Sequence, residues 1–465
     1  MSYIGLPFVV LTCVLLIAYY GLPIKARNKV LLIGSILFAL LSGVRTLLVV
    51  LVVATFAFVF GKVIKAAQKG AQKTTAFVIA LIAVTTPWLF VKLGGLSTVG
   101  TNGTVIAIVG ISFYTLELIS YLAEVFKDKQ KPEKGYFKFL TYALYFPKLV
   151  QGPISRYDDF SLELIREKRF DYATFSEGFV KVLYGFFLKL VIADKAAILI
   201  NPVFERPWAY QGVYCILAAV LYSVEIYADF LGCVEICLGV SDMLGIKLFE
   251  NFKRPYMSTD FKQFWNRWHI SLSKWLSDYI YIPLGGSRKG NIRRYINLAI
   301  TFIVSAFWHG VGVTFLIWGL LHALYRIFEE LLKNRVTPKK EHVLMKRIKV
   351  FALATFGWVF FRAASVGEAL SLIKYSVTGL NRAMFDGALI KNTMGYKEFL
   401  ILVCAILFLA AKEMLNERKI SFMKLLMQLP QAVRIALYVA AVVVIMVFGT
   451  YGVGFDASAF IYGGF

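Results

Sequence analysis

The sequence predicts an all-α, polytopic membrane protein of roughly 11 transmembrane helices, with shorter segments that re-enter the bilayer or lie at its surface. Apolar residues make up 59% of the 465 residues and charged residues only 17%, against about 45–50% and about 25% in soluble domains. A water-soluble fold of this length cannot bury so much apolar surface, because the buried fraction rises slowly with size. Runs of about 17–25 mostly apolar residues also recur from end to end, and each can span a hydrocarbon core about 30 Å thick.

Six of these runs define the two ends of the chain. The first five are centred on residues 8–20, 30–41, 47–60, 76–91 and 104–126, and the last lies at 435–448. No lysine or arginine precedes the first run, so we expect it to be a retained span rather than a cleaved signal peptide.

Lysine and arginine alternate between successive connecting segments. Basic residues follow the first, third and fifth spans, whereas Gly94–Gly103 carries no charge. The positive-inside rule therefore places the basic segments, including those near 339–349 and 412–424, in the cytoplasm and both termini outside. Two outer termini require an even number of full crossings, so one counted segment is re-entrant or one more crossing exists.

The net charge of +23 also comes from these basic connecting segments. In a soluble protein it would suggest nucleic acid, but here the charges lie between apolar runs, where they set orientation and meet anionic lipid. We expect a lipid bilayer as a partner and no nucleic acid. Cys233 and Cys237 are four residues apart, but no second pair of ligands accompanies them, so we expect packing cysteines and no metal site.

The middle of the chain differs from both ends. Prolines interrupt its apolar stretches, and several segments mix charged with aromatic residues. Irregular or charged backbone at membrane depth is tolerated only where protein shields it or where it lines a cavity. No internal repeat or separate soluble domain is visible. We therefore expect one membrane-embedded domain over residues 1–465, with its functional centre at about 140–330.

His322 lies in the apolar helical run 315–332 and is the strongest candidate for catalysis. An ionisable residue in a membrane span is rare and is a functional hypothesis by default. Desolvation favours the neutral imidazole, which can accept a proton. A packing histidine bonded to a carbonyl is an equally weighted alternative from these residues alone. His309, beside Trp308 and Gly310, fits a structural or tunnel-lining role at least as well as catalysis, and His342 in a basic segment is expected to be solvated.

Residues 251–294 are too polar for a span and too aromatic for a solvent loop. Trp265, Trp268 and Tyr279 alternate there with Arg267, His269 and Asp278. One interpretation is an interfacial helix anchored by its aromatic residues, and the other is the wall of a polar cavity. Composition does not separate them. We expect the cavity, because unpaired Arg267 and Asp278 in hydrocarbon would cost several kcal/mol.

Four segments resemble the membrane-bound O-acyltransferase superfamily, in the branch of the alginate O-acetyltransferase membrane subunit and the peptidoglycan O-acetyltransferases. They are Gly110-Ile-Ser-Phe-Tyr-Thr115, Tyr145-Phe-Pro-Lys-Leu-Val-Gln-Gly-Pro153, Phe264-Trp-Asn-Arg-Trp-His-Ile-Ser-Leu-Ser273 followed by Tyr281-Ile-Pro-Leu-Gly-Gly286, and Phe307-Trp-His-Gly310 followed by Trp318-Gly-Leu-Leu-His322. The resemblance covers most of the chain and is clearest from about 110 to 330.

The resemblance implies that His322 is the catalytic histidine and that the helices surround a central tunnel across the bilayer. It implies that an acyl group passes from a cytoplasmic thioester donor, with acetyl-CoA expected and no bound cofactor, to an extracytoplasmic acceptor in a bacterial cytoplasmic membrane. Candidate tunnel- or substrate-lining residues are His309, Trp308, Trp268, His269, Arg267, Asp278, Gln151, Asp229 and Trp318.

The chain departs from that branch at several positions. Ala323 stands where the branch has glycine after the catalytic histidine, and Ser277 stands where it has arginine. Its Tyr-x-Asp-Phe-Ser-Gly-Tyr-Ser-Asp pattern reads Tyr227-Ala-Asp-Phe-Leu-Gly-Cys-Val-Glu235 here, which keeps two carboxylates and loses two hydroxyls and an aromatic ring. Alginate is therefore not assumed as the acceptor.

From the resemblance and from the apolar position of His322, we expect the neutral imidazole to act as a general base on an acceptor hydroxyl. General-base catalysis contributes about 10²–10⁴-fold to the rate. The acceptor is either a hydroxyl of a cell-surface glycan or a side chain on an extracytoplasmic partner protein. Two alternatives remain: transfer of D-alanine from a carrier protein to teichoic acid, and a lipid or acyl transporter that makes no bond. Against the transporter, the paired broken helices or inverted repeats common in such proteins are not found.

Overall fold

A computed structural model describes residues 2–97, 108–335, 342–378 and 387–451. All regular elements in these ranges are helical, in agreement with the predicted class. Contacts group the chain into two compact units, which are described separately. Unit 1 comprises the described residues within 1–182 and 233–250, and unit 2 comprises those within 183–232 and 251–457. The expectation that residues 1–465 act as one domain stays a prediction.

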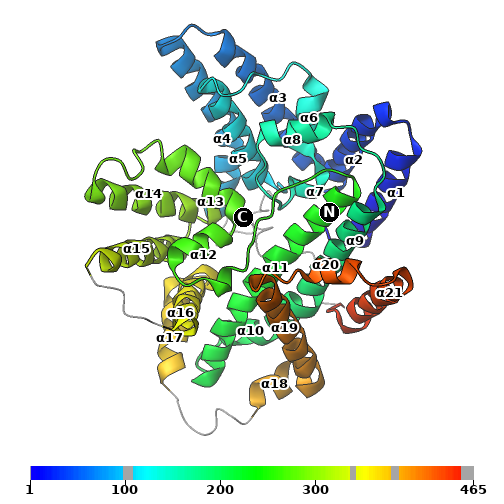
Figure 1. Cartoon of the computed structure of the whole chain (residues 1–465). Helices are drawn as coiled ribbons and strands as arrows, with labels where there is room; N and C mark the ends of the chain where they lie inside the picture. The colour runs from blue at the N-terminus through cyan, green and yellow to red at the C-terminus, as the bar shows by residue number, and fades with distance from the viewer. Residues whose placement is uncertain (1, 98–107, 336–341, 379–386, 452–465) are drawn as a thin grey trace. The chain divides into compact units, whose positions relative to one another are not determined.

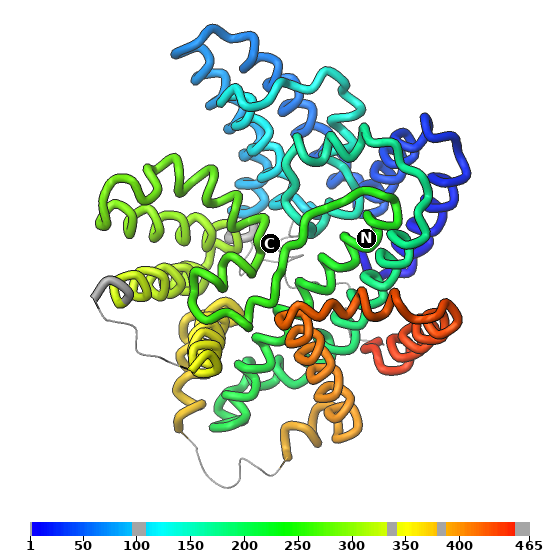
Figure 2. The backbone as a smooth tube through the Cα atoms, in the orientation of Figure 1, coloured from blue at the N-terminus to red at the C-terminus, as the bar shows by residue number. Residues whose placement is uncertain are grey.

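Unit 1 holds the helices of the N-terminal part of the chain (Figure 1). They are α1 (Leu6–Gly21), α2 (Arg27–Leu41), α3 (Val44–Ala66), α4 (Ala71–Ser97), α5 (Ile111–Phe126), α6 (Tyr136–Leu144), α7 (Phe146–Leu149), α8 (Tyr157–Ile165) and most of α9 (Tyr172–Phe187), with the C-terminal end of α11 (Val213–Met243). Helices α3, α4 and α5 pack against one another and run side by side in Figure 2.

The basic segments after α3 and after α5 meet at one end of this three-helix group. Asp128, with a φ of 54°, accepts hydrogen bonds from Lys65 at 2.8 Å and from Lys73 at 2.5 Å. The two lysines lower the pKa of the Asp128 carboxyl to about 2. The two segments therefore lie on the same side of the group, as the charge alternation requires. Most of the uncharged segment Gly94–Gly103 and the chain after Tyr451 lie outside the described residues.

Which side that is stays a prediction, and labelling can test it. We expect single cysteines placed at Lys69 and Lys129 to be cytoplasmic, because the excess of lysine in both segments favours the inner face. A membrane-impermeant maleimide should label them in inside-out vesicles and not in intact cells. Labelling of both in intact cells would reverse the proposed orientation, and labelling of one alone would contradict their shared side.

Unit 2 holds the elements that follow. They are the π-helical turn Leu188–Ala193, α10 (Asp194–Glu205), most of α11, the 3₁₀ turn Pro255–Met257, α12 (Phe261–Arg267), α13 (Ile270–Leu276), the π-helical turn Ser277–Tyr281, α14 (Asn291–His309), α15 (Val313–Arg335), α16 (Val343–Arg362), α17 (Val366–Val377), α18 (Ala388–Thr393), α19 (Gly395–Glu417), α20 (Phe422–Met427) and α21 (Gln431–Phe448). Helix α15 packs between α14 and α16, and the short α12 lies against it (Figure 1).

By length and composition, four described helices can cross a membrane: Val44–Ala66, Ala71–Gly94, Val213–Met243 and Gln431–Phe448. Leu6–Gly21 is a shorter apolar helix. The predicted spans at the two ends of the chain thus coincide with helices, and α5 begins at Ile111, inside the predicted run 104–126. The count of roughly 11 crossings stays a prediction.

Candidate active site

His322 lies in the middle of α15 and is fully buried. Trp318, Tyr325 and Glu329 occupy the same face of this helix, because side chains three or four residues apart project in nearly the same direction. An amphipathic helix normally buries apolar residues on such a face. Here the face instead carries a buried imidazole and indole and a half-buried phenol and carboxylate, which is unusual chemistry for simple packing.

Aromatic rings from four helices surround the imidazole. The ring centroids of Trp265, Trp318 and Tyr325 lie 5.1, 5.3 and 5.6 Å from that of His322. The remaining neighbours are Phe261 at 5.7 Å, Trp358 at 5.9 Å, Phe264 at 6.3 Å and Phe302 at 6.4 Å. We call these seven residues the aromatic box. It comes from α12, α14, α15 and α16, and it makes the surroundings of the imidazole apolar.

Neither ring nitrogen of His322 has a hydrogen-bond partner among the described residues. The same holds for the Trp265 and Trp318 Nε1 atoms and the Tyr325 hydroxyl, which belong to the box. The large majority of buried side-chain polar atoms in native structures are paired, so each exception calls for an explanation. A packing histidine bonded to a carbonyl, the alternative left open by the sequence, is not what these residues form. The group instead offers an acceptor and several donors to a substrate.

Gly357 on α16 keeps the space beside the imidazole open. A Cβ atom at this position would lie 3.0 Å from His322 Nε2 and 3.7 Å from the Trp318 ring. That distance is shorter than ordinary van der Waals contact. Because glycine in a helix interior costs about 1 kcal/mol relative to alanine, its presence here fits a need for room at Nε2.

This arrangement leads to a prediction for Gly357→Ala. We expect acyl transfer to fall by about tenfold or more, since misplacement of a reacting group by about 1 Å can cost about 10²-fold. Thermal stability should change little, because the better helix propensity of alanine offsets the crowding. Gly367→Ala in α17 is the matched control, since its nearest neighbour would be Ser365 Oγ at 3.8 Å. Full activity of Gly357→Ala would show that the space is not used.

The short α12 is held against α15 at its first turn. The Asp260 side chain caps the helix by accepting a 2.7 Å hydrogen bond from the Gln263 backbone N–H. Glu329 on α15 accepts a 2.7 Å hydrogen bond from the Phe261 N–H. Both bonds satisfy N–H groups that a helix start leaves free. They place Phe261, Phe264 and Trp265 on the imidazole.

The other histidines of unit 2 lie outside this box. His309 packs on Trp318 at 5.0 Å and on Trp308 at 4.8 Å, so the Trp318 indole lies between it and His322. His269 has a left-handed backbone with a φ of 44°, lies within 3.4 Å of the Asn251 amide oxygen and contacts Trp308 at 5.9 Å. Both are buried.

The remaining candidates divide between the two units. Trp268 stacks on Phe264 and contacts Trp358 at 5.0 Å, so it packs on two residues of the box. Arg267 binds Glu417, and Asp229 binds Lys189 at 2.7 Å. Asp278 is half-buried in a π-helical turn. None of these three charged residues belongs to the box.

Gln151 lies in unit 1. It is fully buried, and neither polar atom of its side chain has a partner among the described residues. Its backbone oxygen accepts from the Cys233 and Cys237 thiols at 3.2 Å each. These cysteines therefore pack, and the described residues contain no group of three or more potential metal ligands.

Several members of the box were not among the residues predicted from the sequence. Phe261, Phe264, Phe302 and Trp358 carried no polar signal, and their contacts come from other helices. The helical spacing from Trp318 through His322 to Tyr325 and Glu329 was a usable signal. It would have added Tyr325 and Glu329 to the site.

Comparison with known proteins gives a family match. The profile described as MBOAT, membrane-bound O-acyltransferase family, matches residues 46–366, which include His322 and every residue of the box. "Probable alginate O-acetylase AlgI" of Pseudomonas fluorescens is 31% identical over 383 residues, 79% of this chain and 75% of that protein.

Two relatives with other printed activities match over shorter stretches. "Peptidoglycan O-acetyltransferase" of Helicobacter pylori is 33% identical over 302 residues, 58% of this chain and 56% of that protein. "Teichoic acid D-alanyltransferase" of Bacillus subtilis is 29% identical over 277 residues, 55% of this chain and 69% of that protein.

Proposed function

The chain belongs to the membrane-bound O-acyltransferase family and is a multi-pass membrane enzyme, and from this premise we propose its reaction. It transfers an acetyl group from a cytoplasmic thioester donor, acetyl-CoA, across the membrane to hydroxyls of a cell-surface polysaccharide or of peptidoglycan. The transfer is direct or passes through an extracytoplasmic partner protein, in the cytoplasmic membrane of a bacterium. The resemblance to proteins named as O-acetylases and O-acetyltransferases supports acetyl as the acyl group.

One observation carries the proposal: a buried imidazole whose two nitrogens have no partner among the described residues, inside an apolar box. A neutral imidazole in this setting is a proton acceptor, and the box keeps water from the reacting atoms. Exclusion of water matters because it would otherwise hydrolyse the thioester.

In the proposed step a nitrogen of His322 takes the proton of the acceptor hydroxyl as its oxygen attacks the thioester carbonyl. The C–O bond forms, the C–S bond breaks, and the proton passes from the imidazolium to the leaving thiolate, so that a thiol and an ester result. The Trp265 and Trp318 N–H groups and the Tyr325 hydroxyl are candidates to stabilise the carbonyl oxygen as it gains charge, since these donors of the box have no partner in the described part of the chain.

Transfer of D-alanine is the second candidate, and the teichoic acid D-alanyltransferase relative favours it. We place D-alanine transfer second for two reasons. The identity to the D-alanyltransferase relative is lower, and the Tyr281–Gly286 segment is more similar to the acetyl-transferring branch. The two candidates share the proposed chemistry at His322 and differ in the donor and in the acyl group.

A donor assay separates them. Membranes carrying the protein receive radiolabelled acetyl-CoA, and base-labile ester is measured in the purified envelope polymer. We expect label that depends on the protein. Label from a D-alanyl carrier protein and none from acetyl-CoA would replace acetyl by D-alanyl transfer, and label from neither donor would contradict the proposed function.

A further inference from the structure

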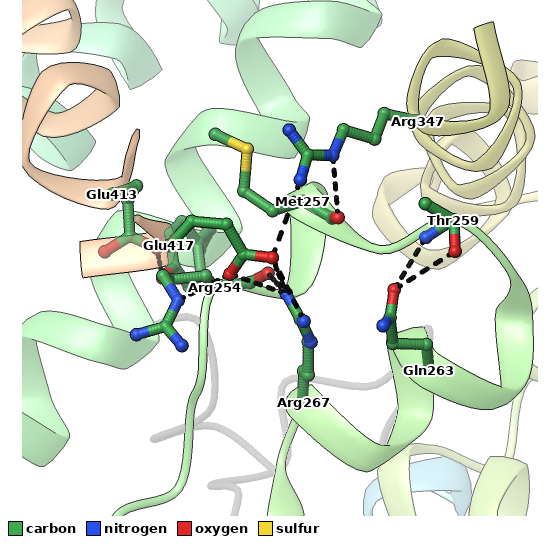
Figure 3. Close-up of polar contacts among 9 residues, drawn as sticks. Arg254, Met257, Thr259, Gln263, Arg267, Arg347, Glu413 and Glu417 are labelled. Carbon is green, nitrogen blue, oxygen red and sulfur yellow. Dashed lines mark hydrogen bonds and ion pairs between the residues drawn. The ribbon is translucent and has the colours of Figure 1, made fainter. Parts of the chain in front are cut away.

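Three arginines of unit 2 converge on the single carboxylate of Glu417, at the last residue of α19 (Figure 3). Arg254 Nε donates to it at 2.8 Å, and Arg267 donates through both terminal nitrogens at 3.1–3.2 Å. Arg347 Nη2 lies 3.5 Å away. We call these four residues the arginine cluster. Glu417 lies beyond the residues that the family profile matches.

The carboxylate does not balance the three positive charges. A second acidic residue near the cluster in the described part of the chain is Glu413, whose carboxylate accepts a 2.8 Å hydrogen bond from the Tyr227 hydroxyl. Even when Glu413 is counted as charged, the cluster keeps an excess positive charge. Burial acts to raise the pKa of Glu417, but hydrogen bonds from Arg267 and Arg254 outweigh it and the pKa is lowered. The carboxylate thus stays ionised and holds the arginines together.

Donor capacity is left over as well. Toward the described residues Arg254 donates only through its Nε atom, and its two terminal nitrogens point away from Glu417 in Figure 3. Arg347 uses Nε on the Met257 carbonyl oxygen at 3.0 Å and one terminal nitrogen on Glu417. Their side chains are 31% and 30% exposed. Guanidinium groups with free donors at a partly open surface suit bidentate binding of phosphate.

The cluster is built into the chain that carries the aromatic box. Arg254 has a left-handed backbone with a φ of 53°, and the Lys253 N–H donates to the Arg267 carbonyl oxygen at 2.9 Å. Arg267 ends α12, and Phe264 and Trp265, on the same helix, contact His322. A site at Arg254 and Arg347 therefore lies at one end of a short helix whose other residues pack on the imidazole.

We propose that the arginine cluster binds a phosphate of the acyl donor, a thioester of phosphopantetheine. This inference rests on the proposed function. Such a donor carries its phosphate at one end of an extended arm and the thioester at the other, which matches a phosphate site set apart from His322 along α12. The cluster lies at the end of α19 and near the start of α16, beside segments that the positive-inside rule places in the cytoplasm. The phosphate can belong to free coenzyme A or to the prosthetic arm of a carrier protein.

Binding to the full chain in lipid nanodiscs tests the inference without any transfer step. We expect coenzyme A and 4′-phosphopantetheine to bind more tightly than pantetheine, which lacks phosphate. Arg254→Gln and Arg347→Gln should each weaken phosphate-dependent binding by about tenfold or more, because a hydrogen bond to a charged group is worth that much, and should leave pantetheine unaffected. Arg156→Gln is the matched control, since its side chain is 32% exposed and also faces a carboxylate.

Glu417→Gln is expected to change the affinity for phosphate in the opposite direction from the arginine variants. It removes the negative charge and should tighten phosphate binding, whereas loss of a purely structural anchor would weaken all three ligands alike. Equal binding of the three ligands by the wild-type protein, or a uniform loss in the arginine variants, would overturn the inference.

The same titration identifies the source of the phosphate. Tighter binding of coenzyme A than of 4′-phosphopantetheine means that the nucleotide phosphates are bound, and equal binding points to the phosphate that a carrier also presents. Phosphate-dependent binding without acyl transfer from any thioester would contradict the proposed function and leave the phosphate site standing.

Discussion

Replacing His322 with alanine or glutamine should abolish most acyl transfer while the protein still folds and inserts. The expected loss is about 10²–10⁴-fold in rate, the range for removal of a general base. No hydrogen bond to a described residue is lost with the imidazole, because both ring nitrogens lack such partners. Glutamine also fills most of the space that alanine would leave empty. Transfer is measured in membranes at matched expression, with detergent chromatography as the check on folding.

His309→Gln is the control for this result. His309 is buried like His322 and shares with it a contact to Trp318, but it lies outside the box, so its replacement should reduce transfer much less. If His322→Gln folds normally and keeps near-wild-type transfer, the assignment of the base is wrong. If both variants lose transfer equally, the two histidines act together and the single-base mechanism fails.

Replacing Lys148 with methionine should prevent normal accumulation of the folded protein. Lys148 forms an ion pair with Glu117 in unit 1, and the two side chains are only 2% and 5% exposed. Glu117 also accepts a 2.9 Å hydrogen bond from the Ser155 N–H, and Lys148 lies 4.4 Å above the Tyr142 ring. Loss of one partner leaves a buried charge uncompensated, at a cost of about 3–5 kcal/mol. The segment that carries Gln151 lies between these contacts.

The measurement is the thermal unfolding temperature of purified protein, together with its yield. The double variant Lys148→Met with Glu117→Leu should recover much of the loss, since replacing a buried ion pair by apolar residues is often neutral. Lys65→Met removes an exposed partner of Asp128, with 45% and 44% exposure, and should have a small effect. Equal effects of Lys148→Met and Lys65→Met would show that burial does not set the energy of these pairs.

Local patterns predicted the helices at the two ends of the chain, and they pointed to His322, whose catalytic role stays a prediction. The apolar runs centred on 47–60 and 76–91 became α3 and α4, because a run of that length in a membrane protein can satisfy its backbone only as a helix. His322 was identified by its motif and by its apolar helix. Trp265 packs on His322 and Trp268 on Trp358, and that the segment Trp265–Tyr281 surrounds a cavity stays a prediction.

Contacts between distant segments could not be predicted in this way. Glu417 lies 150 positions from Arg267, and no periodicity or motif in either segment indicates the pairing. Gly357 and Trp358 lie on the next helix after that of His322, and their contacts with it depend on how α16 packs on α15. Asp229 is a second example: its motif suggested a lining residue, which stays a prediction, and its ion pair with Lys189 in unit 2 could not be predicted from spacing. Spacing reveals which residues share a helix face, but packing decides what that face meets.

Transfer of an acyl group across the membrane, with His322 as the base, is tested best by placing donor and acceptor on opposite sides of sealed vesicles. Inside-out vesicles expose the cytoplasmic face, and they are loaded with the acceptor polymer and any extracytoplasmic partner before labelled acetyl-CoA is added outside. The account predicts base-labile acetyl ester on the enclosed polymer with the wild-type protein and about 10²-fold less with His322→Gln. Ester that forms equally well with His322→Gln, or only when acetyl-CoA is placed inside with the acceptor, would contradict it.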